Sequence, residues 1–316
     1  MATTQVTNST YAGEKAAPYI SAALLSANTL ENGGLTIKQN IKFKQVVKTL
    51  AVGSGLIQDM DCDFSANSSV TVDERILEPK PFKVNLELCK EEYRSDWDAI
   101  SMGYSAHDRL PPSFEDYLLA EVAANVATDI EKMIWQGDSG NTGEFDGFLK
   151  LFGDDGTVID VAGQAGGVTA ANVIDELGKV VDAIDESIYG KEDLVIYIPQ
   201  NVHRAYIRAL GGFQSGGQGA NGVGARGTMW ASGMGQPLEF DGVKLFVANG
   251  LPSSTMVAAQ RSNLWFGCGL LRDENEVKLI DRSQIEGDDN VRIIMKFTSA
   301  VQYAYGAEVV LYTPAS

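Results

Sequence analysis

The chain has 316 residues, and 25 Lys and Arg against 42 Asp and Glu give it a net charge of −17 at pH 7. Hydrophobic residues make up 44% of the sequence and aromatic residues 9%, which excludes a largely disordered chain. The strong negative charge argues against a nucleic-acid-binding surface, because phosphate recognition relies on Lys and Arg. The length suggests about two domains.

The first ninety residues favour strands over helices. Met1–Thr10 carries no charged side chain and has little to bury, so we expect a mobile arm, or one that only a neighbouring molecule orders. Lys83–Leu88 alternates polar and apolar residues, as a half-buried strand does. Ile41 and Phe43 alternate with lysines, and Val70–Val72 leads into a charged stretch. Together these segments predict a long extension of two or three strands with polar positions on both sides.

The clearest helix runs from Ser113, a good N-cap residue, to Gln136. Glu115 and Asp116 complement the helix dipole in the first turn, and Gly137 supplies a C-terminal stop. Apolar residues recur every three or four positions and form one stripe: Leu119, Val122, Val126, Ile130, Met133 and Ile134. Such a helix is a rod about 36 Å long, which few small globular domains need.

The second half of the chain predicts a compact α/β unit followed by strands. A helix starts near Thr169 and ends at Gly190, and a buried strand, Leu194–Ile198, follows it. A short helix over Asn201–Leu210 leads into a glycine-rich loop, Gly211–Gly227. Further strands are expected at Val243–Ala248, Thr255–Ala259, Leu264–Gly267, Glu276–Ile280, Val291–Thr298 and Ala307–Tyr312.

Two short patterns imitate ligand-binding motifs. Gly217–Gly222 fits G-x-G-x-x-G, but a dinucleotide site needs a strand before this motif and a helix after it, and here a helix precedes it. We interpret it as a surface loop. The alternating aspartates of Asp59–Asp63 resemble the start of a calcium loop, yet Phe64 and Val70 stand where Gly and Glu are required. We interpret these aspartates as a solvated turn.

The remaining reactive side chains predict no site of chemistry. Cys62, Cys89 and Cys268 are odd in number and far apart, which argues against a disulfide framework or a metal cluster and favours a reducing compartment. We expect Cys268 to be buried or half buried, and His107 and His203 to be ordinary hydrogen-bonded or surface histidines.

Two further acidic pairs, Asp154–Asp155 and Asp288–Asp289, are interpreted as turns beside glycine. No apolar run approaches the length of a membrane-spanning helix, and we expect no membrane partner. We therefore predict that the protein is not an enzyme and has no catalytic residue, no cofactor-binding residue and no metal site.

The order of segments carries more information than any of these motifs. The long helix is followed by Gly137–Gly140 and then by Phe145–Leu149, an aromatic-x-Gly-apolar-Leu segment. Later come Asp241–Val247, Leu251–Val257 and Leu264–Gly267, a strand, a proline turn and a strand that ends in glycine. This order, over about residues 35–316, resembles the major capsid proteins of tailed bacteriophages, which share the Hong Kong 97-like shell fold.

The resemblance implies an α+β fold with four parts. Residues 1–34 would be the N-terminal arm, and residues 35–92 the extended β loop. Residues 93–168 and 286–316 would form the peripheral domain with the long spine helix, and residues 169–285 the axial domain. A rigid rod and extensions that reach neighbours suit a flat shell subunit, whose interfaces commonly bury about 2,000–5,000 Å².

The same resemblance implies function and partners. We expect a major capsid protein that assembles as hexamers and pentamers into the icosahedral shell around the dsDNA genome of a tailed phage. It would be located in the virion after assembly in the host cytoplasm, with portal and decoration proteins as partners and DNA enclosed without sequence-specific binding. Only about 34 residues precede the extended loop, so we expect a separate scaffolding protein instead of a fused one.

Covalent cross-linking is not expected. In the founding member of the family, a Lys in the extended loop bonds to an Asn of a neighbour, and neither residue can be matched here. The candidate lysines, Lys42, Lys44 and Lys48, lie in a run whose alternation indicates a solvated face, where a lysine is charged and a poor nucleophile.

Two alternatives to a phage capsid remain. The shell protein of a cargo-holding bacterial nanocompartment, of the encapsulin type, uses the same fold but typically has a helical N-terminus. Thr3, Thr4, Thr7 and Asn8 are poor helix formers, which favours the phage interpretation. The second alternative is a soluble enzyme with a glycine-rich lid, which the empty inventory of catalytic residues disfavours.

Overall fold

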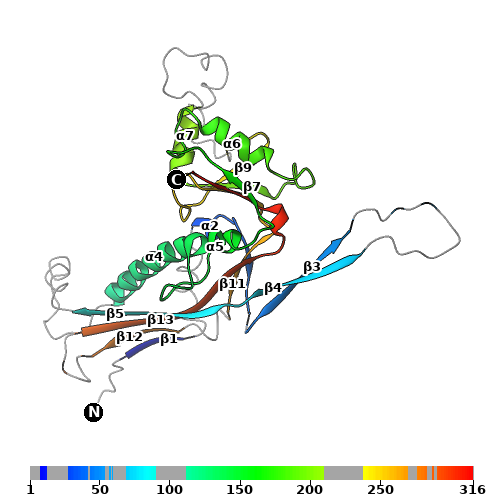
Figure 1. The fold of residues 1–316 in the computed structure, drawn as a ribbon. Coiled ribbons are helices and arrows are strands. Elements are labelled where there is room, and N and C mark those ends of the chain that lie inside the picture. The colour runs from blue at the N-terminus through cyan, green and yellow to red at the C-terminus, as the bar shows by residue number, and fades with distance from the viewer. Residues whose placement is uncertain are drawn as a thin grey trace.

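The computed structural model describes residues 8–12, 28–41, 43–53, 57, 59, 69–89, 112–209, 238–269, 276–282, 287 and 290–315. Within these residues the chain is a mixed α+β fold, as expected, with one long helix, two larger sheets and a separate two-stranded ribbon (Figure 1). The glycine-rich loop, Cys62, His107 and Asp288–Asp289 lie outside the described residues. No helix of the described part is both long enough and apolar enough to cross a membrane.

The first sheet lies beneath the long helix in Figure 1 and has the strand order β1-β12-β13-β11-β2, with β5 on the other side of β13. Its strands are β1 (Asn8–Ala12), β2 (Thr36–Lys38), β5 (Lys80–Cys89), β11 (Leu264–Cys268), β12 (Glu276–Asp281) and β13 (Asn290–Tyr303). Alternate residues of β13, from Val291 to Phe297, are buried. They face the core that includes the long helix, as the period of two in a strand requires.

The long helix is α4 (Pro112–Gln136), and its expected apolar stripe is confirmed. Five of the six stripe positions are buried, and Met133 packs against the same cluster while partly exposed. Gly137 follows the last residue of the helix, but it does not act as the glycine C-cap that the sequence suggested. It is not in the left-handed conformation; instead, a Cβ atom there would lie 2.2 Å from the carbonyl oxygen of Phe145. Close backbone approach therefore requires the glycine.

The second sheet has the order β6-β14-β10-β7-β9-β8. Its strands are β6 (Ile159–Ala162), β7 (Leu194–Ile198), β8 (Glu239–Phe240), β9 (Val243–Val247), β10 (Met256–Gln260) and β14 (Val310–Thr313). All residues of β7 and β10 are buried, because both faces of this sheet are covered. Helices α6 (Val173–Asp182) and α7 (Gln200–Ala209) share a core with one face, and the other face joins the core that contains α4.

Helix α6 is shorter than the sequence suggested. It ends at Asp182, although Ile184 and Ile188 of its expected stripe are still buried. The backbone N–H of Ser187 donates to the Asp185 carboxylate at 2.7 Å, a local turn that competes with continued helix. Gly190, at φ +84°, closes this turn.

The N-terminal segment departs from expectation in two places. Asn8–Ala12 forms a strand against β12 of the same chain, although we expected only a neighbour to order it. Backbone hydrogen bonds to the open edge of β12 supply what side-chain burial does not. Residues 28–34, which were expected to belong to the N-terminal arm, include the short helix α2 (Asn28–Glu31), and Thr29 and Leu30 are buried in the core.

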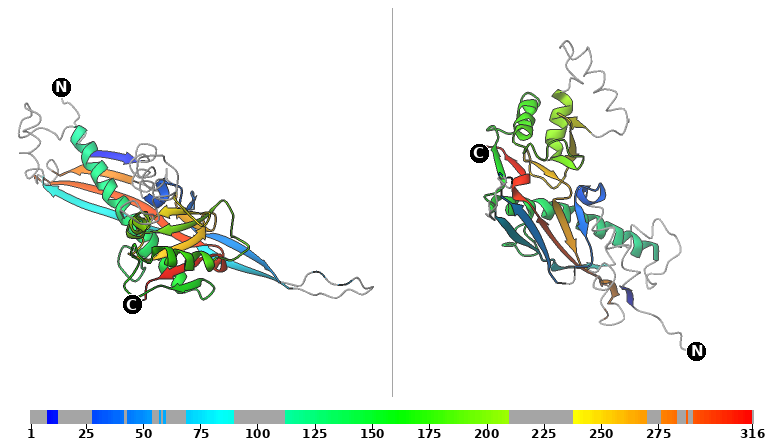
Figure 2. Two further views of the ribbon diagram at one scale, coloured as in Figure 1. Left: turned by 90° about the horizontal axis from the view of Figure 1, so that it is seen from above. Right: turned by 90° about the vertical axis from the view of Figure 1, so that its right-hand side faces the viewer.

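The ribbon consists of β3 (Gln45–Val52) and β4 (Val70–Leu77), paired antiparallel along their whole length. It projects from the end of the first sheet, away from the rest of the molecule (Figures 1 and 2). Ile41 and Phe43 precede it but form no strand. Ile41 is buried beside Leu77, and Phe43 is exposed.

Candidate inter-subunit contact surface

The projecting β3–β4 hairpin carries an apolar face. We expected polar positions on both of its sides, but one side is mainly apolar: Val46, Leu50, Val70, Val72 and Ile76, each 48–58% exposed. Val46 pairs with Ile76, and Leu50 pairs with Val72, so these side chains lie directly across from one another. An isolated two-stranded hairpin is marginally stable in water, and a contiguous exposed apolar patch marks an interaction site. This apolar hairpin face is therefore a candidate contact surface for another molecule.

A single ion pair interrupts the apolar hairpin face. The Lys48 ammonium lies 3.3 Å from the Glu74 carboxylate, and the two residues are direct cross-strand partners. Lys44 makes a similar exposed pair with Glu78 at 2.8 Å. Lys44 and Lys48 are exposed in the single chain, as expected, but Lys48 lies on the apolar hairpin face, and Lys42 lies outside the described residues.

The base of the hairpin is fixed to the body by Arg75 and Leu77 of β4. Leu77 is buried beside Ile41 and Ala300. The Arg75 guanidinium donates to the Asp155 carboxylate at 2.5 Å and lies 4.1 Å from the centre of the Tyr303 ring. The hairpin is therefore anchored by apolar packing and by a partly buried charge.

Asp155 is more than the turn that its sequence suggested. It does lie in a turn, where the N–H of Thr157 donates to it at 2.9 Å, but it also accepts a hydrogen bond from the Tyr303 hydroxyl at 2.6 Å. Burial alone would raise the pKa of this carboxyl, yet hydrogen bonds from Tyr303, Arg75 and Thr157 hold the pKa well below its ordinary value. Sequence reasoning missed this role because Arg75 is 80 residues away and Tyr303 is 148.

A second polar cluster joins the long helix to two distant segments. Glu131, although buried, accepts hydrogen bonds from the backbone N–H of Thr29 at 2.9 Å and from the backbone N–H of Gly250 at 3.2 Å. The Thr29 hydroxyl also donates to Glu131, and the Trp135 indole N–H donates to that hydroxyl at 3.1 Å. The one signal for this cluster in the sequence was the spacing of Glu131 and Trp135, which are four residues apart and therefore lie on the same side of the helix.

The turn after α4 is held by charge. Lys150 on α5 (Phe148–Gly153) donates to Asp138 and lies 2.8 Å from the Asp146 carboxylate. The N–H of Ser139 donates to Asp146 at 2.9 Å. Burial would raise the pKa of Asp146, but the hydrogen bonds from Lys150 and Ser139 lower it to about 2. This network holds the Gly-Asp turn and the segment that follows it in one fixed arrangement.

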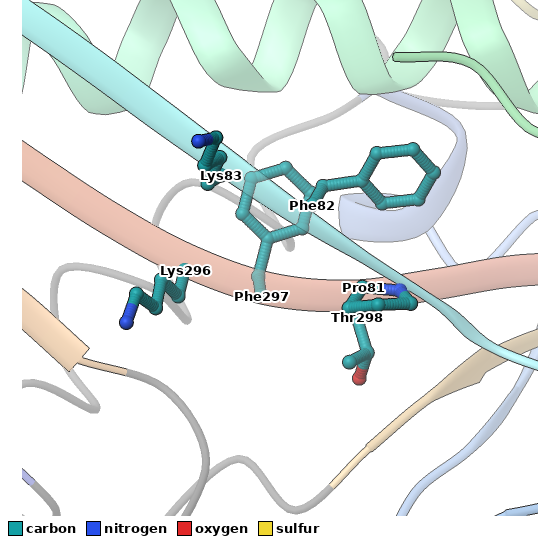
Figure 3. Close-up of a pocket in the computed structure, with 6 residues that line it drawn as sticks. All are labelled: Pro81, Phe82, Lys83, Lys296, Phe297 and Thr298. Carbon is teal, nitrogen blue, oxygen red and sulfur yellow. The ribbon is translucent and has the colours of Figure 1, made fainter. Parts of the chain in front are cut away.

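A hollow of about 400 Å³ lies beside the paired strands β5 and β13, and Figure 3 shows the side chains that line it. The described residues that line it are Pro81, Phe82, Lys83, Lys296, Phe297 and Thr298. The Phe82 and Phe297 rings lie 5.9 Å apart, and they bring no acid, base or nucleophile to the hollow. Two lysines and two phenylalanines do not make a catalytic constellation.

The structure describes Cys268, which was expected to be buried or half buried, and His203. Cys268 is buried, and burial raises the pKa of its thiol to about 11. His203 on α7 is half buried, and its pKa is lowered by that burial and by Arg204. Across the described ranges, no group of three or more His, Cys, Asp or Glu side chains could hold a metal ion.

No protein-family model matches the chain, and no curated protein matches its sequence. Its fold, however, matches solved shells over nearly its whole length. The capsid of a native GTA particle has a TM-score of 0.58 and 15% identity, over 94% of this chain and 91% of that one. The capsid of Myoviridae phage XM1 has a TM-score of 0.57 and 11% identity, over 91% and 92%.

A virus-like particle from Pyrococcus furiosus also matches, with a TM-score of 0.51 and 10% identity, over 94% of this chain and 98% of that one. The long helix, the projecting hairpin and the two sheets thus belong to an arrangement found in phage capsids and in a virus-like particle. The chain has the Hong Kong 97-like shell fold, as its order of segments had indicated.

Proposed function

We propose that this protein is a major capsid protein, which assembles as hexamers and pentamers into the icosahedral shell around the dsDNA genome of a tailed phage. The observation that carries the proposal is the apolar hairpin face, exposed on a ribbon that projects from a chain with a shell fold. A second copy of the chain, whose hairpin would be covered in turn, is the cover that a repeating shell supplies. The role is structural, and we propose no enzymatic activity.

We propose that the chain is divided into the four structural parts that were expected from the sequence. Residues 1–34 are the arm and residues 35–92 the extended loop, which contains the hairpin. Residues 93–168 and 286–316 are the peripheral domain around α4, and residues 169–285 are the axial domain around α6 and α7. The core around α6 and α7 supports the axial part, because all of its buried members except Val168, Val310 and Tyr312 lie within residues 169–285.

The proposed partners follow from this role. One chain must make slightly different contacts at hexamers and pentamers, so a scaffolding protein would guide curvature, and portal and decoration proteins would complete the particle. The net charge of −17 favours a shell that encloses DNA without binding it specifically. We propose location in the virion, after assembly in the host cytoplasm.

A nanocompartment shell is the second candidate, since the fold also matches a virus-like particle. The poor helix formers around Asn8–Ala12, which forms a strand, favour the phage interpretation over a shell protein with a helix in this segment. Electron microscopy of the purified protein separates the candidates. A capsid protein expressed alone gives sheets, tubes or shells of mixed size, whereas a nanocompartment gives small uniform shells and a soluble enzyme gives none.

The hairpin tests the mechanism of assembly. Changing Leu50 and Val72 together to Asp places charge on the apolar hairpin face and should abolish assembly while the body remains folded. The matched control changes Lys48 and Glu74 together to Gln, which alters the same face without loss of apolar area, and it should assemble. Normal assembly of the Asp variant would contradict the proposal.

A further inference from the structure

We propose that Arg75, Asp155 and Tyr303 form a base lock that sets the direction of the β3–β4 hairpin relative to the body. The proposal rests on the proposed function, since the hairpin is taken to be the clasp between copies. The base lock makes these three positioning residues: they act on assembly through the hairpin and are not themselves part of the apolar hairpin face.

Two different contacts fix the Arg75 guanidinium. One of its terminal nitrogens donates to Oδ2 of Asp155 at 2.5 Å, and its central carbon lies 4.1 Å from the centre of the Tyr303 ring. The Tyr303 hydroxyl donates to the same carboxylate at 2.6 Å. The charged hydrogen bond fixes the position of the planar guanidinium group, and the contact with the ring fixes its orientation.

Asp155 and Tyr303, the two residues that contact Arg75, are themselves held in place by their neighbours. Thr157 holds Asp155 through its N–H at 2.9 Å and its hydroxyl at 2.7 Å. A Cβ atom at Gly306 would lie 2.1 Å from the Thr157 hydroxyl oxygen and 2.8 Å from the Asp155 carboxylate, so the chain at Gly306 closes tightly on this pair. Tyr303 is buried and meets Phe152 edge-on at 5.0 Å.

Arg75 is placed where it can resist rotation. Leu77 packs into the body, and the amide of Gln302 donates to the carbonyl of Ile76 at 3.1 Å; both contacts lie on the body side of Arg75 along β4. These two contacts alone would hold the base of β4 but would leave the hairpin able to rotate about that point. The base lock is one step further out along the strand, so it holds the hairpin at one angle about that point.

The hairpin is long enough to amplify an error at its base. From the Val47–Arg75 pair the ladder continues to the Val52–Val70 pair, five residues further out. At about 3.3 Å per residue, a tilt of roughly 20° would move the far end by about 6 Å. Apolar contact is lost beyond about 4.5 Å, so the base lock determines whether the apolar hairpin face meets its neighbour.

The test measures the hairpin direction in unassembled subunits. Spin labels on non-natural residues at Thr71, near the far end of β4, and at Glu186, in the body, report the distance distribution by pulsed electron resonance. Wild type should give one narrow distribution. Arg75→Met, which keeps the alkyl stem but removes the fork and charge, should broaden it at least about twofold, and Asp155→Asn should do the same.

The matched control is Arg292→Met. Arg292 pairs with Glu87 at 3.2 Å on the first sheet, but both side chains are 43% exposed and neither belongs to the hairpin. This control should keep the narrow distribution. Combining Arg75→Met with Asp155→Asn should add nothing to either single change, since the two residues act as a unit. A distribution that stays narrow in Arg75→Met, or broadens equally in Arg292→Met, overturns the proposal.

Assembly gives the second readout. By light scattering, Arg75→Met should raise the critical concentration for assembly by about tenfold, whereas a merely stabilising residue would lower the melting temperature and leave that concentration unchanged. If wild type forms no sheets, tubes or shells, the proposed function fails, while the label distances still decide whether the base lock exists.

Discussion

At the residue scale, three carboxylates with little exposure join segments that are far apart in sequence. Asp155 receives Arg75, and Glu131 receives the N-terminal segment. Glu176 accepts from the Tyr312 hydroxyl at 2.6 Å, 136 residues away. Burial would raise the pKa of Glu176, but this hydrogen bond and one from a nearby lysine lower it. Each carboxylate is retained in an apolar setting because donors surround it.

Glu131 should contribute strongly to stability. Glu131→Ala leaves the N–H groups of Thr29 and Gly250 without their acceptor, so we expect the free energy of unfolding to fall by about 2–4 kcal/mol. Glu131→Gln, which keeps an acceptor oxygen, should cost less. Urea denaturation of unassembled subunits measures both. Glu121→Ala, an exposed position on the same helix, is the control, and an equal loss there would contradict the assignment.

The Asp155 interaction should depend on pH in a defined direction. Because the folded pKa of Asp155 lies well below the ordinary 3.8, its stabilisation is fully present above the unfolded pKa and is lost as pH falls through the folded pKa. Urea midpoints from pH 7 to pH 3 should show wild type more stable than Asp155→Asn at pH 7. The gap should narrow below about pH 4. A gap that widens in acid would refute the lowered pKa.

At the element scale, α4 is the rod that the sequence predicted, and its stripe can be tested directly. Ile130 is fully buried, so Ile130→Asp places a charge in the core and should lower the free energy of unfolding by more than about 4 kcal/mol. Glu121→Gln, off the stripe, should be mild. Circular dichroism during thermal unfolding distinguishes them, and two normally folded variants would show that the stripe does not face the core.

Elements with a local period were predictable, and their connections were not. The stripe of α4 and the five buried residues of β7 follow from spacing within one segment. The apolar hairpin face was missed because Lys48 separates Val46 from Leu50, and the charged run Asp73–Arg75 separates Val72 from Ile76. The hydrogen-bond partners of Arg75 and Glu131 lie 80 to 119 residues away, and no periodic signal links them.

At the scale of the whole molecule, the second sheet stands between two cores. One core contains α4 and much of the first sheet, and the other contains α6 and α7. Trp135 of α4 lies 5.1 Å from Tyr197 of β7, so the rod and the second sheet are packed together. A body packed in this way, with one hairpin fixed at its base, is suited to repeating a single geometry around a shell.

The assembled shell should be held by non-covalent contacts. An isopeptide bond needs a neutral lysine that is free to attack a neighbour, whereas Lys44 and Lys48 are each paired with a carboxylate of their own chain. Denaturing electrophoresis of mature particles should show one band near 34.0 kDa. A ladder of multiples that survives boiling and reductant would contradict this expectation.

The most direct test of the account is a cryo-electron microscopy reconstruction of particles assembled from this protein. We predict a closed icosahedral shell in which the apolar hairpin face, Val46, Leu50, Val70, Val72 and Ile76, is buried on a neighbouring copy. A shell that leaves these five side chains in solvent, or a protein that forms no closed shell with its scaffold, would contradict the account.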